Sequence, residues 1–262
     1  MLITSKDNES IKHIRKLKEK KYRDEYNEYI IEGIKLIKEA IFEKAKIKTI
    51  VVCDDYAKAE DIEQELLYDI AKYNCIYVDS KVFASITDVQ KPQGILAILE
   101  KNKGEETIDF SQEVIVALDD VQDPGNIGTI LRTIDSCGLN QIILSKKSAD
   151  VYNPKVVRST MGAILRVNIV ETEDLSKTLK DIKKHKFNIV VTSLQTDKSM
   201  YDIDYKKKVI VIGNESNGVS KEIQDLADTK IKIPMLGRTE SLNAAVATSV
   251  VLYEYVRQKI TK

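Results

Sequence analysis

The second half of the chain alternates short, largely apolar runs with amphipathic segments. The apolar runs span residues 114–118, 142–145, 187–193, 209–213 and 231–234. Between and after them, apolar residues recur at helical spacing over residues 126–137, 175–186 and 242–259. Continuous apolar runs are typical of parallel strands that are covered by helices on both faces. The pattern therefore predicts an α/β domain built on a mostly parallel sheet.

The first part of the chain shows the same alternation on a smaller scale. It predicts strands at residues 29–33, 49–53, 75–79 and 94–100, and helices at residues 34–44 and 61–73. Residues 101–112 are polar and highly charged and show no apolar periodicity, which is typical of a linker. We therefore expect two domains, residues 1–104 and 112–262, of which the first is the smaller α/β domain.

Composition and cysteine spacing narrow the class of protein. Of 262 residues, 43% are hydrophobic and 31% are charged, which is typical of a globular enzyme. The chain contains no apolar stretch long enough to cross a membrane and no hydrophobic signal core at its start, so a cytoplasmic protein is expected. Cys53, Cys75 and Cys137 lie far apart and form no CxxC pair, which favours buried or half-buried thiols over disulfides or a zinc site.

The net charge is zero, with 41 basic and 41 acidic residues, so the whole chain lacks the usual signal of a nucleic-acid binder. The charge is nevertheless uneven. Residues 1–23 contain eight Lys or Arg and three Asp or Glu, a local excess of five basic residues. This segment is either a solvated helix face or a surface that neutralises phosphates.

The first of three polar loops that follow predicted strands spans residues 119–133. Pro124 and Gly125 predict a turn, and the start of the helix that follows offers free N–H groups to an anion or a polar ligand. Arg132 lies on that helix among apolar residues, so it either snorkels at an edge or points into a site.

The second loop, GNESNG at 213–218, combines two glycines with a carboxylate and several amide or hydroxyl groups. The third, PMLGRTESLN at 234–243, contains Ser241, a candidate N-cap of the last helix. None of the three loops matches a GxxxxGK[ST] phosphate cradle or a GxGxxG dinucleotide turn. A nucleotide triphosphatase and a nicotinamide dehydrogenase are therefore disfavoured.

Three ordered segments, DPGNIGTILRT, VIGNESNGVS and IPMLGRTESLNAAVATSVVLYE, resemble the motifs of the SpoU/TrmH family of RNA ribose 2′-O-methyltransferases in the SPOUT superfamily. Residues 29–40 and 86–97 are similar to the N-terminal substrate-binding domain of that family. The resemblance implies a methyltransferase domain with a deep trefoil knot, S-adenosylmethionine as cofactor, a homodimer, and no need for a metal. It also favours RNA contact over the solvated-face interpretation of the basic segment.

The resemblance further implies which residues act. The matching catalytic positions are Asn126, Arg132, Glu215, Ser241 and Asn243. The matching cofactor positions are Thr192, Gly213, Asn214, Ile233, Met235 and Leu242, with backbone groups holding the adenosine. RNA contact is expected from Lys12, Arg15, Lys16, Lys20, Lys21 and Arg23.

Arg132 carries the open question of mechanism, because the attacking ribose hydroxyl must lose its proton. The family proposal makes this arginine the base, with help from a substrate phosphate. A guanidinium stays protonated in proteins, so Arg132 could instead bind the phosphate and stabilise the alkoxide while another group accepts the proton. Asn126 and Asn243 then orient the reactants, Glu215 holds the loops, and Ser241 contributes a hydroxyl.

The expected function is methylation of a ribose 2′-OH in RNA, with 23S ribosomal RNA preferred because a separate N-terminal domain resembles those of ribosomal-RNA enzymes. The alternatives are a transfer-RNA methyltransferase, a non-catalytic RNA-binding protein with the same fold, and a different α/β enzyme that uses ATP or NAD. One departure from the family pattern lies in the first motif. Asp135 stands beside Ile134 where the family has small apolar residues, and is expected either to be exposed or to lie near a dimer contact.

Overall fold

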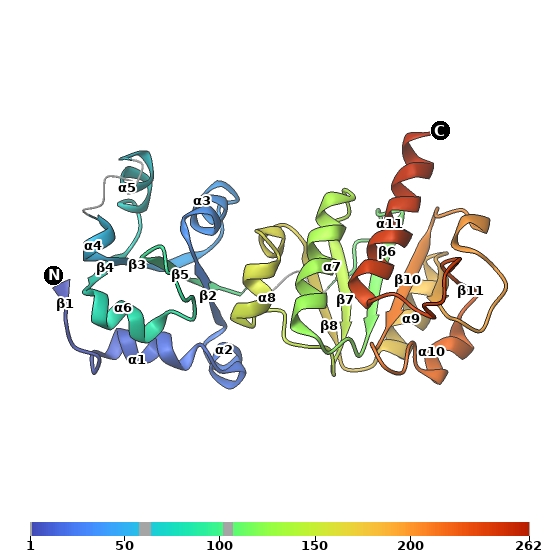
Figure 1. Cartoon of the computed structure of the whole chain (residues 1–262), viewed down its shortest axis with the longest axis horizontal. Coiled ribbons are helices and arrows are strands. Elements are labelled where there is room, and N and C mark those ends of the chain that lie inside the picture. Colours follow the sequence, from blue (N-terminus) through green and yellow to red (C-terminus); the bar gives the residue numbers. More distant parts are fainter. Residues whose placement is uncertain (1, 58–63, 102–106, 262) are drawn as a thin grey trace. The chain divides into compact units, whose positions relative to one another are not determined.

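The computed structural model describes residues 2–57, 64–101 and 107–261. The chain divides into two compact units, and Figure 1 labels the elements of each. The first unit comprises Met1–Asn102 together with Asp150–Leu165, and the second comprises Lys103–Ala149 with Arg166–Lys262. The chain therefore passes between the units three times. The expected domain ranges, 1–104 and 112–262, stay a prediction.

The first unit contains a five-stranded mixed sheet in the order β1-β4-β3-β5-β2. Its strands are β1 Leu2–Ile3, β2 Glu28–Glu32, β3 Ile47–Cys53, β4 Cys75–Val78 and β5 Ile95–Glu100. β4 pairs in parallel with β1 and β3, whereas β5 is antiparallel to both β3 and β2. The central strands are buried along most of their length, as the apolar runs predict.

Helices cover this sheet. They are α1 Glu9–Lys16, α2 Lys20–Tyr26, α3 Ile34–Phe42, α4 Asp54–Ala57, α5 Gln64–Ile70, α6 Ser80–Ile86 and α8 Pro154–Ser159. Ile11 and Ile14 of α1 and Phe83 of α6 are buried in one cluster with sheet residues such as Val51 and Leu96. α1 and α6 therefore bury their apolar sides in the core of this unit and leave their polar sides in solvent.

The segment Asp150–Leu165 belongs to the first unit although it connects two strands of the second. Arg23, only 2% exposed, donates from Nε to Asp150 Oδ2 over 3.1 Å. Arg23 Nη1 also donates to the Leu17 and Lys18 carbonyls. The Tyr152 ring packs 4.9 Å from the Tyr29 ring, measured between centroids. The buried ion pair and the aromatic contact hold this segment against the α1–α2 corner and β2.

The second unit contains a six-stranded sheet in the order β11-β9-β10-β6-β7-β8, and every pair in it is parallel. Its strands are β6 Val114–Asp119, β7 Gln141–Ser145, β8 Asn168–Thr172, β9 Asn188–Thr192, β10 Lys208–Gly213 and β11 Thr229–Ile231. Its helices are α7 Pro124–Ser136, α9 Leu175–Lys184, α10 Lys221–Leu226 and α11 Ala244–Ile260. The expected α/β class with a mostly parallel sheet is confirmed.

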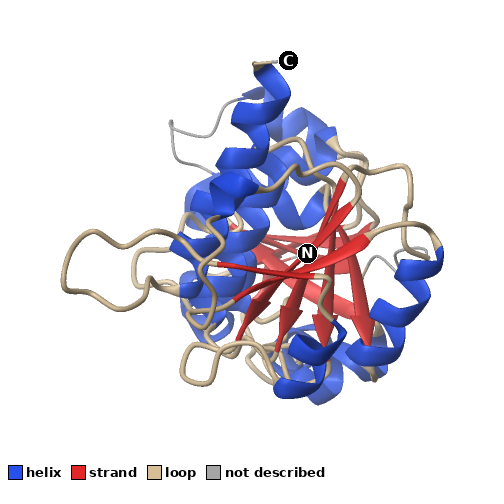
Figure 2. Ribbon diagram, turned by 90° about the vertical axis from the view of Figure 1, so that its right-hand side faces the viewer, coloured by secondary structure: helices blue, strands red, loops and turns tan. Residues whose placement is uncertain are grey.

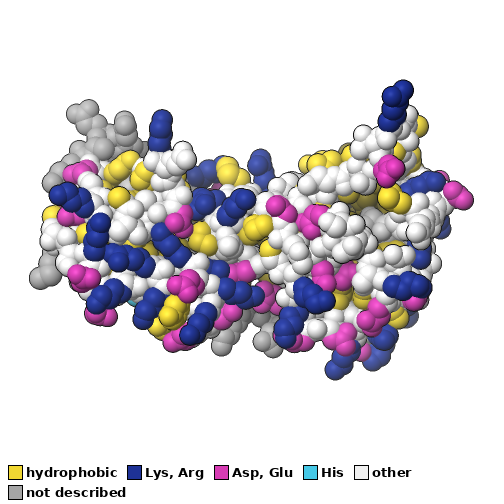
Figure 3. Space-filling view, turned by 60° about the horizontal axis from the view of Figure 1, so that its bottom comes forward, with side chains coloured by type: hydrophobic (Ala, Val, Ile, Leu, Met, Phe, Trp, Pro, Cys, Tyr) yellow, Lys and Arg dark blue, Asp and Glu magenta, His cyan; other side chains and the backbone are white. Residues whose placement is uncertain are grey.

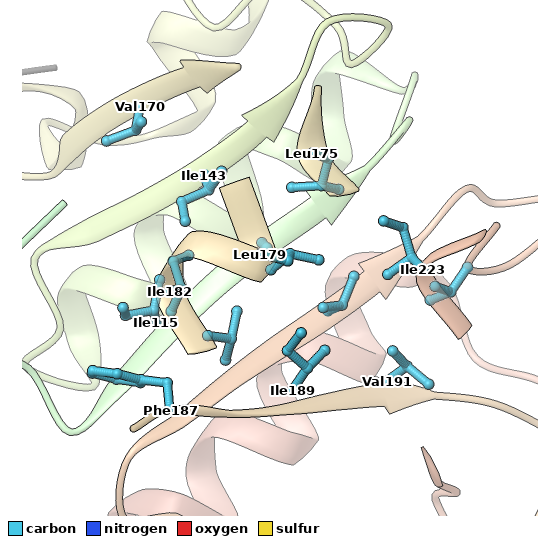
Figure 4. Close-up of a cluster of buried hydrophobic side chains, with 14 residues drawn as sticks. Ile115, Ile143, Val170, Leu175, Leu179, Ile182, Phe187, Ile189, Val191 and Ile223 are labelled. Atoms are coloured by element: carbon cyan, nitrogen blue, oxygen red, sulfur yellow. The ribbon is translucent and has the colours of Figure 1, made fainter. Parts of the chain in front are cut away.

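Helices lie on both faces of this parallel sheet. Figure 1 shows α7 and α11 in front of it and α9 and α10 behind, and Figure 2 views the same unit end-on. On the α9 side, Leu179 and Ile182 pack into one cluster with Ile115, Ile143 and Ile189 (Figure 4). Neighbouring strand residues face the other side, so the strands are buried on both faces and read as continuous apolar runs.

Several element boundaries differ from the sequence-based expectation. β1 and β8 were not expected, because β1 has two residues and only Val170 of β8 is buried. The strand expected at 231–234 is wrong: β11 starts at Thr229 and ends at Ile231. Beyond it, Lys232 forms a single bridge to Ser199, and Pro234 has no N–H to continue a ladder. Residues 61–63 of the helix expected at 61–73 lie outside the described residues.

The three cysteines are free thiols, as expected: Cys53 and Cys137 are buried, and Cys75 is half-buried. Burial raises the pKa of the Cys75 and Cys137 thiols. In the described parts of the chain, no helix is both long enough and apolar enough to cross a membrane.

Candidate active site

Three loops of the second unit meet at the carboxyl ends of its parallel strands. β6 and β9 both pair with β10, and all three run in the same direction. The loop after β6 leads into α7, the loop after β10 forms the turn 213–218, and the segment after β11 leads into α11. Ligands of open parallel sheets bind at this edge, where loops from adjacent strands converge.

A directed chain of side-chain hydrogen bonds connects the three loops. The N-cap of α11 is Asn243, so the expectation that Ser241 caps this helix is wrong. Asn243 Oδ1 accepts from the backbone N–H groups of Ala245 and Val246 at 2.9 and 3.3 Å. Its Nδ2 therefore faces Asn126 Oδ1, to which it donates over 2.8 Å. Asn126 Nδ2 in turn donates to Glu215 Oε1 over 2.8 Å. Because each amide has one acceptor and one donor end, this chain has only one orientation.

Glu215 is the acceptor at the end of this chain. Its carboxylate also accepts from the backbone N–H groups of Gln122 and Asp123, at 3.2 and 3.1 Å. Burial raises the pKa of the Glu215 carboxyl, but the hydrogen bonds from Asn126 and the backbone outweigh that effect, so the pKa lies below its usual value. Glu215 is therefore ionised at neutral pH and joins the loop after β10 to the start of α7.

The turn that carries Glu215 is held by its own backbone. Asn214 and Gly218 exchange two backbone hydrogen bonds, at 3.0 and 2.9 Å. A Cβ on Gly213 would lie 2.1 Å from the backbone of Gly218 and Val219, so only glycine allows this close approach. Asn214 Nδ2 donates to the Asp120 carbonyl over 2.9 Å, which ties the turn to the end of β6.

Arg132 lies near the middle of α7, and its side chain is exposed. No hydrogen bond or ion pair joins Arg132 to any residue that the structure describes. Its neighbours Leu131 and Thr133 are buried. The guanidinium is therefore free to bind an anion, and its planar fork matches the geometry of a phosphate.

A cavity of about 330 Å³ lies beside this chain of hydrogen bonds. Its volume is within the roughly 300–1,000 Å³ that is usual for small-molecule sites. All six positions matched to cofactor binding line it: Thr192, Gly213, Asn214, Ile233, Met235 and Leu242. Glu215 and Ser241 also line it. Asn126 is connected to it through its hydrogen bond to Glu215, and Asn243 through its hydrogen bond to Asn126. The structure thus brings together residues separated by fifty positions in the sequence.

Further lining residues were not singled out from the sequence. They include Ser193, Leu194 and Gln195 after β9, Gln224 on α10, and Ala244 and Ala247 on α11. The first three directly follow Thr192, a position matched to cofactor binding, at the end of the strand predicted at 187–193. That position is the sequence signal that could have identified them. Gln224 lies in a short helix that has no such signal, and only the fold brings it to the cavity.

The basic residues of the first unit fall into different environments. Lys12 pairs with Glu9 at 2.9 Å, and Arg15 donates to the Lys6 carbonyl. No carboxylate among the described residues lies within ion-pair distance of Lys16, Lys20 or Lys21, and all three are exposed. These three lysines are free to bind phosphates.

The expected RNA contact by Arg23 does not fit the structure. Its guanidinium is buried and saturated by Asp150 and two carbonyls, so it is not presented to a ligand.

Asp135, the departure from the family pattern, is neither fully exposed nor unpaired. Its carboxylate accepts from Arg166 Nε and Nη2 at 3.1 and 2.9 Å. The side chains of Asp135 and Arg166 are 29% and 30% exposed. A carboxylate is tolerated at this position of α7 because a bidentate arginine partner compensates it.

Comparison with known proteins follows the same division of the chain. Residues 113–253 match the model of the SpoU rRNA Methylase family, and residues 8–97 match the MRM3-like substrate binding domain. The 23S rRNA (guanosine(2553)-2′-O)-methyltransferase RlmP of Bacillus subtilis is 31% identical over 252 residues, covering 96% of this chain and 97% of that protein.

Two solved structures share the fold over nearly the whole chain. The AdoMet-bound rRNA methyltransferase from Sinorhizobium meliloti is 33% identical and covers 98% of both chains, with a TM-score of 0.84. The SpoU methyltransferase AviRb from Streptomyces viridochromogenes, in complex with AdoMet, is 26% identical and also has a TM-score of 0.84, covering 97% of this chain and all (100%) of that one. The chain belongs to the SpoU rRNA methylase family.

Proposed function

We propose that this protein transfers a methyl group from S-adenosylmethionine to a ribose 2′-hydroxyl of 23S ribosomal RNA. The observation that carries the proposal is the 330 Å³ cavity, with the Asn243–Asn126–Glu215 chain at its side and the unpaired Arg132 on the same helix as Asn126. The RlmP relative, named for 23S rRNA and similar along its whole length, supports the choice of RNA.

The cavity fits the cofactor chemically. Ile233, Met235 and Leu242 offer apolar surface to a flat adenine ring, and the polar turn 213–218 also lines the cavity. The close packing at Gly213 keeps that turn in place before a ligand arrives. When bound, S-adenosylmethionine supplies a methyl group on a sulfonium, which is an excellent leaving group.

The residues of the protein then have to position the ribose and assist removal of the proton from its 2′-hydroxyl. Glu215 is ionised and already accepts three hydrogen bonds, so it is a poor candidate to take the hydroxyl proton. Its role is to hold Asn126 and the start of α7. Arg132 has no partner among the described residues, which favours binding of the substrate phosphate and stabilisation of the developing alkoxide. We propose that the bound phosphate, rather than Arg132 itself, accepts the proton.

The test is methyl transfer from labelled S-adenosylmethionine to separate transcripts of 23S rRNA, 16S rRNA and tRNA. Label is expected in 23S rRNA at ribose 2′-oxygens, and mapping of 2′-O-methylation in cells with and without the protein identifies the nucleotide. Label in tRNA alone would assign the protein to tRNA instead. Binding of S-adenosylmethionine without methylation of any RNA would make it a non-catalytic RNA-binding protein.

We also propose that the protein acts as a homodimer in the cytoplasm. Val246 and Tyr253 of α11 are 48% and 53% exposed. They lie seven positions apart, so they occupy one face of the helix. An apolar face of this kind on a helix beside the site is a surface that a second copy of the chain can cover.

A further inference from the structure

Two tyrosines form an aromatic surface on the short helix α2. The rings of Tyr22 and Tyr26 are nearly parallel, 12° apart, with centroids separated by 6.2 Å. The His13 ring of α1 lies 4.7 Å from the Tyr26 ring and tilts against it by 60°. Both tyrosines are half-buried, and no residue described in the structure hydrogen-bonds to the Tyr22 hydroxyl. The Tyr22 ring therefore lies on a packed support with part of its surface in solvent.

Uncompensated positive charge surrounds this ring. The Nζ atoms of Lys16 and Lys21 each lie 5.5 Å from the Tyr22 ring centroid. Lys16 is the last residue of α1, and Lys20 is a third exposed lysine, on α2 with Lys21. Figure 3 shows many Lys and Arg side chains on the face of the first unit that carries α1 and α2. We call the set of Lys16, Lys20, Lys21, Tyr22 and Tyr26 the Tyr22 platform.

The contrast with nearby cations is informative. Lys18 pairs with Asp88 at 2.8 Å, and Lys12 pairs with Glu9 at 2.9 Å. Charges that flank the platform are thus neutralised by carboxylates, whereas those of the platform have no such partner among the described residues. Lysines of this kind beside an aromatic face complement a ligand that has both negative charge and a flat ring.

The backbone beneath the platform is held by the hydrogen bonds of a buried arginine. Arg23, the residue after Tyr22, is buried and binds the carbonyls of Leu17 and Lys18 as well as Asp150. These bonds fix the corner between α1 and α2, and α2 ends at Asn27 in a left-handed cap. A ligand that binds here does not have to order the surface first, which favours binding.

We propose that Tyr22 stacks against an unpaired nucleobase of the RNA substrate while Lys16, Lys20 and Lys21 neutralise the phosphates next to it. The proposal rests on the proposed function only in taking RNA as the substrate. A base in a duplex has both faces covered by its neighbours, so this contact selects single-stranded segments, loops or bulges over helices.

Stacking must outcompete the lysine contacts that the ring already makes. A cation over an exposed aromatic face stabilises the contact by roughly a two- to fivefold change in its equilibrium constant. A base stacked on an aromatic side chain increases the affinity for the nucleic acid by roughly 5- to 150-fold. A base can therefore displace a lysine from the ring, and the displaced ammonium gains a phosphate in exchange.

The experiment uses the full-length protein and a single-stranded RNA of about twelve nucleotides with one 2-aminopurine. The same sequence annealed to its complement is the duplex probe. Tyr22→Leu removes the aromatic face and keeps apolar bulk, and Tyr22→Phe keeps the face. Tyr68→Leu is the matched control, because Tyr68 is an exposed tyrosine of the same unit with the Nζ of Lys72 4.6 Å from its ring centroid. Circular dichroism and S-adenosylmethionine affinity establish that each variant is folded.

Tyr22→Leu is expected to raise the Kd for single-stranded RNA by roughly 5- to 150-fold and to abolish 2-aminopurine quenching. The Kd for the duplex, and the slope of log K against log salt, are expected to stay unchanged. Tyr22→Phe and Tyr68→Leu should bind as the wild type does. Charge reversal of Lys16, Lys20 and Lys21 should instead flatten the salt slope by roughly 0.7 for each phosphate that the protein no longer neutralises.

Equal weakening of single-stranded and duplex binding by Tyr22→Leu would overturn the stacking role, as would unchanged affinity for both. Absence of salt-dependent binding to either RNA would also overturn the proposal. Binding is measured without turnover, so it is separate from the proposed function. If Tyr22 dependence is found and no RNA is methylated, the stacking site stands and the proposed activity fails.

Discussion

At the residue scale, the site depends on a chain of side-chain hydrogen bonds from Asn243 to Glu215. The backbone N–H donors at one end of this chain and the carboxylate acceptor at the other determine the orientation of the two amides between them. The N–H groups at the start of α11 fix Asn243, Asn243 fixes Asn126, and Asn126 donates to an ionised Glu215. The three loops are therefore tied together before any ligand binds. Arg132 is outside this chain, which leaves its charge available to the substrate.

Replacement of Arg132 by alanine is expected to lower the rate of methyl transfer by roughly a hundredfold or more, the usual effect of removing a group that stabilises developing charge. Affinity for S-adenosylmethionine should change little, because Arg132 does not line the cavity. Single-turnover methylation and calorimetry measure the two quantities. Arg132→Lys retains the charge without the planar fork, so intermediate activity is expected from it. Unchanged turnover in Arg132→Ala would remove this residue from the mechanism.

Glu215→Gln is expected to destabilise the second unit by about 0.5–1.5 kcal/mol at neutral pH, because an amide cannot accept from all three donors without turning its own N–H groups toward them. The effect is modest because the Glu215 side chain is exposed. The folded pKa of Glu215 is lowered, so its stabilisation is present above its ordinary value of 4.5 and is lost as the pH falls through the folded pKa. The thermal unfolding midpoints of the wild type and of Glu215→Gln should therefore converge in acid. Exposed Glu171, changed to Gln, is the control. A stability difference that grows as the pH falls would contradict this assignment.

At the element scale, the segment Asp150–Leu165 connects β7 and β8 of the second unit but packs as part of the first. Its helix α8 contacts β2, and Asp150 pairs with a fully enclosed arginine. Nothing in the helical spacing of α2 distinguishes Arg23 from its exposed lysine neighbours. Arg23 is buried because its position on α2 faces the corner between α1 and α2, which the segment Asp150–Leu165 covers.

Arg23→Ala is expected to destabilise the first unit by about 3 kcal/mol, since it leaves the Asp150 carboxylate, whose side chain is only 10% exposed, without a counter-charge. Hydrogen exchange of the β2 and β5 amides over a urea series measures this, and Lys20→Ala, at an exposed position of the same helix, is the control. Equal protection in both variants would show that the ion pair contributes nothing to the docking of the segment.

The exposed face of α11 leads to a prediction about assembly. Tyr253→Glu is expected to convert a dimer to a monomer, because it places a charge on an apolar face that a partner would cover. Light scattering after size-exclusion chromatography gives the mass. Phe42→Glu, at an 82% exposed position on α3 of the first unit, should leave the mass unchanged. If light scattering gives the mass of a monomer for the wild-type protein, the proposed homodimer is wrong.

At the scale of the whole molecule, two units are connected by three passages of the chain. The second unit carries the cavity and the chain of hydrogen bonds, and the first carries the Tyr22 platform. The family and the α/β class expected from the three motifs are confirmed. The trefoil knot was implied by the resemblance alone and stays a prediction, as do the roles of the individual site residues.

The sequence by itself determined the parallel sheet, because strands buried on both faces must be apolar at every position and such runs are visible in one dimension. It also placed Asn126, Glu215 and Asn243 on loops after those strands. Only the tertiary structure decided that Asn243 and Asn126, 117 positions apart, lie 2.8 Å from each other, and that Arg23 is buried while Lys20 and Lys21 are exposed. The physical reason is that periodicity reports which face of an element is buried, whereas a partner for a polar side chain depends on the path of the whole chain.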